Sequence, residues 1–324
     1  GGFPHAAGPV PRALSAAGAA PFEQARSAGV YDKAIARGRL VAMAERPPRP
    51  LALGGAEPCY LLQHPRIDFV SYPYEWTFSA WRAAALLHLD FHLDLLEDGF
   101  TLSDATAYNV QFEGTRPVFI DHLSVVPHED GAPWNGQRQF AMQFLGPLLL
   151  WAKRGVVPNA WFRGSGEGIA PEDLTALLRT RDKLSFTVLA HVVGPAMVHR
   201  RRVAKGGESG PGRTARLPRR NLIAMLKTLR DYIAGLRLPP DRTIWSDYAG
   251  NNSYEEAQRA AKHDFVGRAV ASASPRLAFD IGCNSGDFSR TALDHGARSV
   301  VGFDFDFGAL ERAYARFARG GGGG

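Results

Sequence analysis

Two kinds of hydrophobic spacing divide the chain. Apolar residues recur every three or four positions in Ser79–Leu96 and in Leu217–Leu236, a spacing that predicts amphipathic helices. Near the end of the chain the pattern changes to two short apolar runs, Leu277–Ile281 and Arg298–Phe303, which predict buried strands. A glycine-containing turn and a short helical stretch separate these two runs. The pattern therefore predicts a mainly helical first part, followed by a strand–loop–helix–strand unit.

The turn after the first predicted strand carries the most specific chemistry in the sequence. It reads Asp-Ile-Gly-Cys-Asn-Ser-Gly from Asp280 to Gly286. The glycines Gly282 and Gly286 let the backbone pass close to a ligand, and Asn284 belongs to a residue type that tolerates a left-handed conformation. In a βαβ unit, an acid at the tip of the second strand, here Asp304, is placed to accept hydrogen bonds from ribose hydroxyls.

These residues resemble motif I and the following acidic strand end of class I S-adenosylmethionine (SAM)-dependent methyltransferases. The family pattern is acid-x-Gly-x-Gly-x-Gly, and Asn at the middle position is a departure that many members share. The resemblance implies a Rossmann-like α/β domain that binds SAM through Asp280, Gly282, Asn284, Gly286 and Asp304. A site for another nucleotide and a plain strand–turn remain alternatives. An NAD-binding domain would need a Gly-x-Gly-x-x-Gly run, which the sequence lacks.

The sheet of such a methyltransferase continues well beyond its second strand, whereas this sequence ends about twenty residues after Asp304. We therefore expect residues 221–324 to hold the N-terminal portion of a methyltransferase domain, incomplete and inactive alone. The catalytic residues of methyl transfer and the methyl acceptor cannot be named from the sequence.

A second set of candidate residues follows the predicted helix Ser79–Leu96. Asn109 comes five positions after Asp104, and Asp121 comes twelve positions after Asn109. This spacing resembles the catalytic core of the protein-kinase-like fold, which implies Asp104 as the base, and Asn109 and Asp121 as the Mg²⁺ ligands. We therefore expect a mainly helical, kinase-like α+β domain over residues 22–199.

The sequence departs from the kinase pattern at several positions. Leu102 and Ser103 stand where His-Arg is usual, and Leu123 stands where the glycine of Asp-Phe-Gly is usual. A glycine-rich phosphate loop is missing, and the only lysine before Lys153 is Lys33, in a helical context. These departures argue against Mg-ATP binding. Three readings stay open: a phosphotransferase, a non-catalytic recognition module in which the Asp121 carboxylate is structural, and an unrelated helical domain.

Two histidines of the helix, His88 and His92, have the i,i+4 spacing of metal ligands. No Cys or Glu motif downstream completes such a site. We expect both rings to be hydrogen-bonded parts of a helical face.

Positive charge is concentrated in one segment of the chain. The formal net charge of the 324 residues is +6, and basic residues concentrate between positions 200 and 220, among glycines and a proline. We interpret 200–220 as a linker between domains, and the Ala/Gly/Pro-rich residues 1–21 as disordered. A nucleic acid partner is an alternative for the linker, but no aromatic residue interleaves the charges to stack on bases. The basic residues are Arg200, Arg201, Arg202, Lys205, Arg213, Arg216, Arg219 and Arg220.

The two cysteines, Cys59 and Cys283, are too few for a disulfide framework, which favours a reducing compartment. The longest apolar run, Leu184–Val198, is interrupted by polar and helix-breaking residues and is too short to span a bilayer. We therefore expect a cytoplasmic protein with no membrane partner.

Several segments together extend the resemblance over about Gly29–Phe317. They are Tyr-Pro-Tyr-Glu-Trp, Asp-Ala-x-x-Tyr-Asn-Val-Gln-Phe, Trp-x-Asp-Tyr and Asp-Ile-Gly-Cys-Asn-x-Gly. The arrangement is similar to a bacterial family of class I SAM-dependent methyltransferases that includes rhizobial nodulation-type members. In such enzymes the segment before motif I often lies over the cofactor, which makes Tyr248, Tyr254 and Lys262 candidate lid residues.

Overall fold

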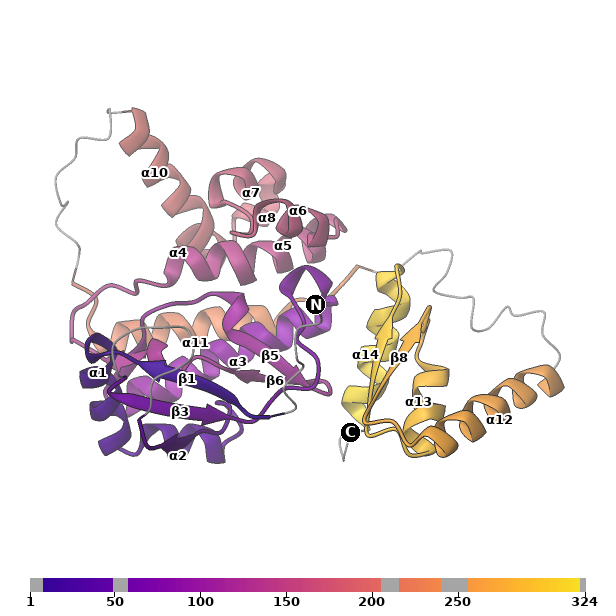
Figure 1. Cartoon of the computed structure of the whole chain (residues 1–324). Helices are drawn as coiled ribbons and strands as arrows, with labels where there is room; N and C mark the ends of the chain where they lie inside the picture. Colours follow the sequence, from indigo (N-terminus) through magenta and orange to yellow (C-terminus); the bar gives the residue numbers. More distant parts are fainter. Residues whose placement is uncertain (1–7, 49–57, 205–215, 240–255, 321–324) are drawn as a thin grey trace.

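The computed structural model describes residues 8–48, 58–204, 216–239 and 256–320. Figure 1 shows a larger N-terminal part, residues 8–239, beside a smaller C-terminal part, residues 256–320. The N-terminal part combines small antiparallel sheets with many helices, and the C-terminal part contains one parallel strand pair.

The N-terminal part begins with a three-stranded antiparallel sheet in the order β1–β3–β2. Its strands are β1 (Val10–Leu14), β2 (Ala44–Arg46) and β3 (Tyr60–His64), and the helices α1 (Ala16–Ser27) and α2 (Val30–Ala36) follow β1.

We expected residues 1–21 to be disordered, but residues 10–14 form a strand and the helix α1 begins at Ala16. Residues 1–7 lie outside the described chain, but Val10 pairs with His64 and Leu14 pairs with Tyr60. Leu14 and Phe22 are almost fully buried. Burial of a few large apolar side chains therefore orders a segment whose Ala/Gly/Pro content suggested disorder.

Helix α3 (Phe78–Glu97) runs through the centre of the N-terminal part, as the spacing of its apolar residues predicted. The hydroxyl of Thr77 caps it by accepting a hydrogen bond from Ala80 N. Trp81 and Leu89 on this helix are fully buried. The helix packs against α11 (Arg219–Gly235) and thereby forms the axis of the core.

Two short antiparallel strand pairs follow α3, and the segments between their strands carry the kinase-like candidate residues. Strand β4 (Phe100–Leu102) pairs with β7 (Val125–Pro127), and β5 (Val110–Glu113) pairs with β6 (Arg116–Phe119). Single 3-10 turns, at Ala107–Asn109 and His122–Ser124, connect them.

The remaining helices of the N-terminal part contain two wide π-helical turns, each directly before a Gly-Pro pair. Proline cannot donate the helical hydrogen bond and its ring displaces the carbonyl four residues earlier, which widens the turn. The Gln143 carbonyl, four residues before Pro147, accepts a hydrogen bond from Trp81 Nε1 at 2.9 Å. The elements are α4 (Gln137–Phe140), the turn Ala141–Leu145, α5 (Gly146–Arg154), α6 (Asn159–Ser165), α7 (Pro171–Leu177), α8 (Thr180–Lys183), α9 (Phe186–Val188), the turn Leu189–Val193 and α10 (Gly194–Ala204).

The described residues of segment 200–220, which we interpreted as a linker between domains, belong mostly to helices. Residues 200–204 complete α10, residues 219 and 220 begin α11, and 205–215 are outside the described residues. The apolar stripe of α11, from Leu222 to Ile233, is buried in the same core as α3. Helix α11 therefore belongs to the N-terminal part, whereas we had assigned it to the second domain.

The C-terminal part has the predicted strand–loop–helix–strand order. It consists of α12 (Glu256–Ala273), β8 (Leu277–Ile281), α13 (Asp287–Asp294), β9 (Ser299–Phe303) and α14 (Phe307–Arg319). Strands β8 and β9 are parallel, with Leu277 opposite Ser299 and Ile281 opposite Phe303.

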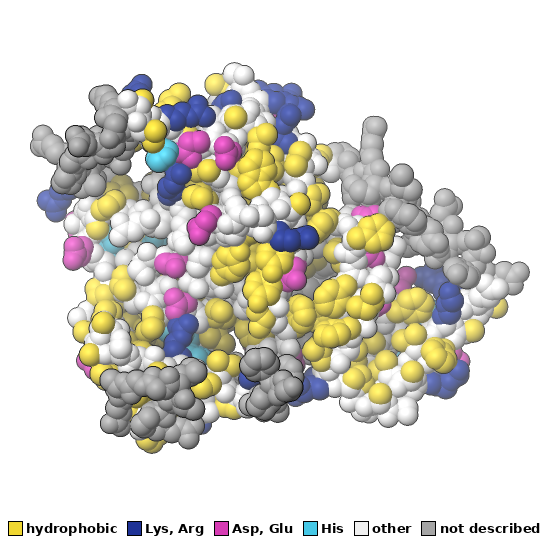
Figure 2. Space-filling model, turned by 45° about the horizontal axis from the view of Figure 1, so that its top comes forward, with side chains coloured by type: hydrophobic (Ala, Val, Ile, Leu, Met, Phe, Trp, Pro, Cys, Tyr) yellow, Lys and Arg dark blue, Asp and Glu magenta, His cyan; other side chains and the backbone are white. Residues whose placement is uncertain are grey.

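We expected β8 to be buried, but Phe279 is 58% exposed and Ile281 is 76% exposed. Both point to the sheet face opposite α13, and within the described residues only β9 pairs with β8. Figure 2 shows hydrophobic side chains in the centre of one face of the molecule and continuing onto the smaller part at the right. The described residues of this part contain one parallel strand pair, and a Rossmann-like sheet stays a prediction.

The two parts contact each other through α14 and through a loop before α3. In this loop Asp68 pairs with Arg276 at 2.8 Å, and the Phe69 ring lies edge-on to the rings of Phe279 and Phe303. The Phe307 ring of α14 lies edge-on to Trp151, with ring centroids 5.6 Å apart.

No helix of the described residues is long and apolar enough to cross a membrane.

Candidate functional sites

The loop between β8 and α13 adopts the backbone that its sequence predicted. Gly282, Asn284 and Gly286 all have positive φ angles, of 78°, 48° and 79°. The amides of Gly282 and Cys283 both donate to the Phe303 carbonyl, at 2.8 and 3.0 Å. These bonds fold the loop over the end of β9, so that it lies beside the residue that follows this strand.

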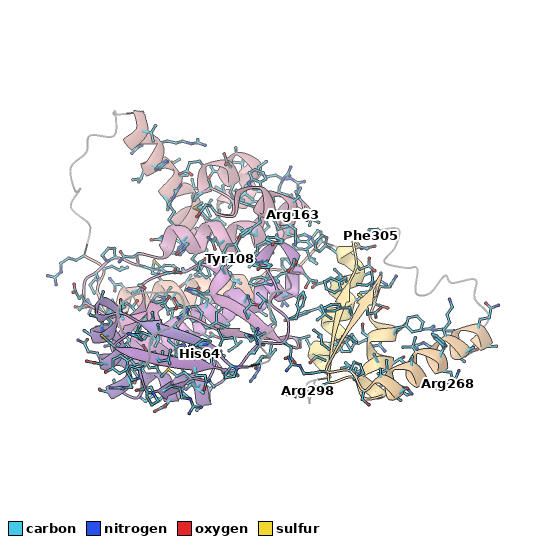
Figure 3. All side chains as sticks on the ribbon, in the orientation of Figure 1. His64, Tyr108, Arg163, Arg268, Arg298 and Phe305 are labelled. Carbon is cyan, nitrogen blue, oxygen red and sulfur yellow. The ribbon has the colours of Figure 1, made fainter. Side chains whose placement is uncertain are left out.

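That residue is Asp304, and its carboxylate is held by the loop. Oδ2 accepts from Asn284 N at 2.8 Å, and Oδ1 accepts from Asp306 N at 2.9 Å. A carboxylate has about four acceptor positions, and these two bonds use one on each oxygen. The half-buried Asp304 side chain can therefore accept two further hydrogen bonds, as a ribose diol requires. Figure 3 labels Arg298 and Phe305, which flank the two ends of β9.

Asp280 is also half-buried, but it contacts a helix. Its Oδ2 accepts from the Ser289 hydroxyl at 2.6 Å, which links β8 to α13. Burial, followed by the negative charges of Asp280 and Asp304, raises the pKa of the Cys283 thiol to about 12. This cysteine is therefore a neutral thiol at physiological pH and is not suited to act as a nucleophile.

Two glycines of this region are required by packing. A Cβ at Gly286 would stand 2.8 Å from the Phe317 ring of α14, and a Cβ at Gly302 would stand 2.8 Å from Cys283 Sγ. In the structure Gly286 makes room for α14, and the close approach of a ligand that we predicted there stays a prediction. No sequence pattern indicated a role for Gly302.

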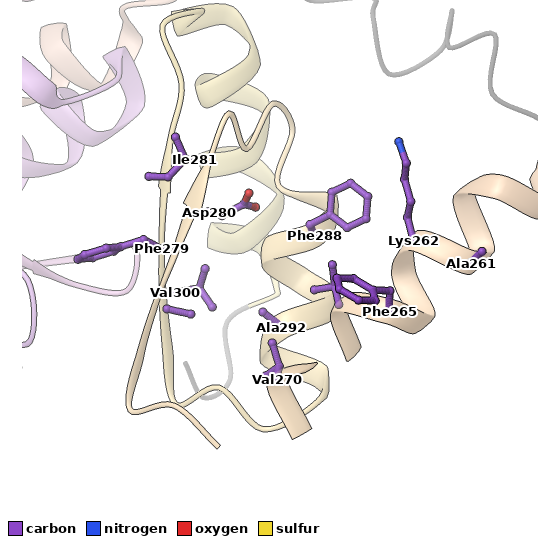
Figure 4. A pocket seen from close by; sticks show the side chains of 12 residues that line it. Ala261, Lys262, Phe265, Val270, Phe279, Asp280, Ile281, Phe288, Ala292 and Val300 are labelled. Atoms are coloured by element: carbon purple, nitrogen blue, oxygen red, sulfur yellow. The ribbon is translucent and has the colours of Figure 1, made fainter. Parts of the chain in front are cut away.

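A pocket of about 540 Å³ lies beside the loop, between α12, β8 and α13. Figure 4 shows Phe265 and Phe288 on the same side of the sheet as Asp280 and Val300, with Phe279 pointing to the other side. Of the predicted cofactor residues, only Asp280 lines this pocket. Its lining is apolar except for Asp280 and the candidate lid residue Lys262, and the other two lid candidates, Tyr248 and Tyr254, lie outside the described residues.

In the N-terminal part, the structure brings together the three kinase-like candidates. Asn109 Nδ2 lies 3.4 Å from Asp104 Oδ1 and 3.5 Å from Asp121 Oδ2. Asp104 Oδ1 also accepts from Thr106 N at 2.7 Å. The spacing in the sequence therefore predicted a real cluster, and the chemistry of its members stays a prediction.

Arg12 completes this cluster, although no sequence pattern indicated it as a site residue. Arg12 Nη1 lies 2.5 Å from Asp121 Oδ1, which also accepts from Leu123 N, while Oδ2 accepts from Ser124 Oγ at 2.5 Å and from Asn109 Nδ2. Burial alone would raise the pKa of Asp121, but the bonds from Ser124 and Arg12 and the charge of Arg12 hold it below its usual value.

Four donors use all the acceptor positions of the Asp121 carboxylate. One of them is the Arg12 guanidinium, which stands beside the residue that the kinase resemblance implied as a Mg²⁺ ligand. Among the described residues, no group of three or more His, Cys, Asp or Glu side chains could hold a metal ion.

The histidines of α3 are core residues. His88 and His92 are fully buried, and burial lowers the pKa of His88 to about 4 and that of His92 well below its usual value. His92 Nε2 lies 2.7 Å from Thr101 Oγ1, which fixes the ring.

The basic segment is divided between two helices in the described chain. Arg200 donates to the Glu172 carbonyl, and Arg219 donates to the Glu97 carbonyl. Lys205 and Arg213 lie outside the described residues.

Comparison with known proteins finds a curated relative. The chain is 43% identical over 300 residues to the nodulation protein NoeA of Rhizobium meliloti (strain 1021), an alignment that covers 92% of this chain and 63% of that protein. The chain thus spans less than two thirds of the length of this relative. No model of a protein family matches the sequence. Among solved structures, vaccinia related kinase 3 matches 68% of this chain and 77% of its own at 14% identity, but a TM-score of 0.30 is too low to carry an argument.

Proposed function

We propose that the C-terminal part binds S-adenosylmethionine and belongs to a SAM-dependent methyltransferase. The observation that carries this proposal is the Asp304 carboxylate, which stands beside a left-handed loop and keeps acceptor positions on both oxygens. A ribose diol presents two hydroxyl donors, which match these positions. When bound, SAM supplies an activated methyl group.

The residues of this chain would hold the cofactor by its nucleoside end. Asp304 would accept from the ribose, and the backbone at Gly282 leaves open space, since a Cβ there would have nothing within 4 Å. Asp280 would act through Ser289, by fixing α13 against β8. The residues that carry out methyl transfer are not among these, and the acceptor remains unassigned. The similarity to a nodulation protein supports a role in that process.

Calorimetric titration with SAM and with S-adenosylhomocysteine tests the proposal. We expect Asp304→Asn to weaken binding at least about tenfold, because it replaces one ionised acceptor oxygen with a donor and hydrogen bonds to charged groups contribute about 1.5–3 kcal/mol. Asp294→Asn is the matched control, because this exposed aspartate pairs with Arg290 within α13. A parent protein that binds neither compound, or equal affinities of Asp304→Asn and the parent, would contradict the proposal.

A second proposal concerns the N-terminal part, which we infer to be a non-catalytic module with a structural polar centre. Arg12 and the other three donors at Asp121 favour this function over phosphotransfer. Such a module can present an acceptor to the C-terminal part. A rise in melting temperature with millimolar Mg-ATP that Asp121→Asn abolishes would argue for the phosphotransferase instead.

A further inference from the structure

Helix α14 lies between the candidate cofactor loop and the N-terminal part, and it contacts both. Phe317 fills the space above Gly286, and Arg316 pairs with Asp287, the first residue of α13, at 2.5 Å. The Arg290 guanidinium of α13 lies over the Phe317 ring, 4.9 Å from its centroid. One side of α14 therefore supports the loop and the start of the following helix.

The other side of α14 contacts the N-terminal part at three positions spaced four and three residues apart. Phe307 meets Trp151, Glu311 accepts from Ser79 N at 3.0 Å and from the Ser79 hydroxyl, and Tyr314 donates to the Thr115 carbonyl at 2.8 Å. This spacing places the three residues on one helical face. Burial and the charge of Glu311 raise the pKa of Tyr314, so its hydroxyl remains a donor.

The Glu311 carboxylate lies at the N-terminus of α3, where free backbone N–H groups and the helix dipole favour a negative charge. Ser79 is the second residue of that helix. Helix α3 is the central helix of the N-terminal part, so α14 is fixed to the axis of its core. Thr115 lies in the turn of the β5–β6 hairpin, whose strands lead to Asn109 and Asp121.

The start of α14 is in turn bonded to the candidate ribose acceptor. Asp306 caps α14 through Gly308 N and Ala309 N, and the Asp306 amide donates to Asp304 Oδ1. The position of the Asp304 carboxylate thus depends on where α14 begins, which depends on the docking of the helix.

We propose that Glu311 and Tyr314 are positioning residues of the candidate cofactor site, through which the N-terminal part sets the geometry of Asp304 and the 282–286 loop. The expected effect on ligand affinity rests on the proposed SAM function. The expected effect on the geometry of the loop does not, because α14 contacts the loop without a ligand.

The double variant Glu311→Ala, Tyr314→Phe tests the inference by two measurements on the 324-residue chain. In ligand-free protein, we expect the amide hydrogens of Asn284 and Asp306, which bond to Asp304, to exchange about tenfold faster. In titrations with S-adenosylhomocysteine, we expect the Kd to rise about fivefold or more, at the low end of coupling between sites. Arg319→Gln is the control, because Arg319 is exposed and donates to Ala315 O in its own helix.

Two outcomes would overturn the inference. Faster exchange at Ser79 and Ala80, with unchanged exchange at Asn284 and Asp306, would mean that docking has been lost without any effect on the loop. Unchanged affinity in a variant that has lost docking would mean that the site is independent of the N-terminal part. If the parent binds no ligand, the proposed function fails, and the exchange rates alone decide the inference. Glu311→Gln keeps an acceptor for Ser79 and should retain most of the protection.

Discussion

At Asp121, four hydrogen-bond donors from three segments of the chain meet on one carboxylate. Removing this acceptor leaves the buried Ser124 hydroxyl without its acceptor and removes the ion pair of Arg12, whose side chain is 35% exposed. Asp104, by contrast, accepts mainly from Thr106 N, two residues away. The two aspartates of the predicted catalytic pair therefore have different structural roles.

We expect Asp121→Ala to lower the free energy of unfolding by roughly 1–3 kcal/mol, the cost of leaving buried partners unsatisfied. Asp104→Ala should cost less, about 1 kcal/mol, since it loses a local turn. Urea unfolding measures both, with Asp98→Ala as a surface control in the exposed Lys33 pair. SAM affinity should be unchanged in both variants. A stable Asp121→Ala protein that had lost methyl transfer but kept SAM binding would instead indicate a chemical role for this carboxylate.

Residue identity predicted some of these features and not others. The left-handed loop follows from the preferences of glycine and asparagine, so Gly282 and Asn284 could be predicted from local sequence. The Arg12–Asp121 pair joins residues 109 positions apart, and no local pattern indicates such a contact. The same limit applies to Glu311, whose partner Ser79 is 232 positions away.

At the scale of elements, periodic apolar spacing predicted α3 and α11, because each presents one continuous face to the core. Two short apolar runs predicted the strands β8 and β9. The pattern could not predict β1, a short edge strand whose order depends on pairing with β3. It also missed the wide turn before Pro147. There the Met142 carbonyl accepts from Ile169 N at 3.0 Å, which brings the Gly168 backbone against the turn.

A pair of glycines close in sequence tests the packing against this turn. An added Cβ at Gly168, which has a φ of 89°, would stand 2.4 Å from the Met142 carbonyl oxygen. We expect Gly168→Ala to destabilise the protein by about 1–3 kcal/mol or more, through overpacking and backbone strain. Gly164→Ala in exposed α6 meets nothing within 4 Å and should be neutral or stabilising by up to about 1 kcal/mol. Similar melting temperatures for the two variants would show that the turn is not closely packed.

The whole molecule contains several buried histidines held neutral by burial. Burial lowers the pKa of His88 and His191 to about 4, and burial with the nearby charges of His64 and Arg12 lowers that of His122 to about 3. Unfolding exposes these rings and restores a pKa near 6.5. Between pH 6.5 and about 4 the unfolded chain therefore binds more protons than the folded chain.

We expect the free energy of unfolding to be highest above pH 6.5, where the histidines are neutral in both states. It should decrease as the pH falls from 6.5 towards 4. The loss should approach roughly 2 kcal/mol per buried histidine at pH 5. The urea midpoint measured between pH 7.5 and 5 tests this expectation. His122→Phe, which keeps a ring against His64 and Tyr31, should reduce the slope. A midpoint independent of pH above 5 would show that these rings are not buried neutral in solution.

The docking of α14 also has a consequence for how the protein is made. Translation proceeds from the N-terminus, so α3 leaves the ribosome more than two hundred residues before the glutamate that bonds to its first turn. Thr77 is available at once and can cap the nascent helix by itself. The N-terminal part can therefore mature around α3 while Ser79 still faces water, and α14 adds its contacts late in biosynthesis. Until that step, the surface formed by Ser79, Thr115 and Trp151 is open on the nascent chain.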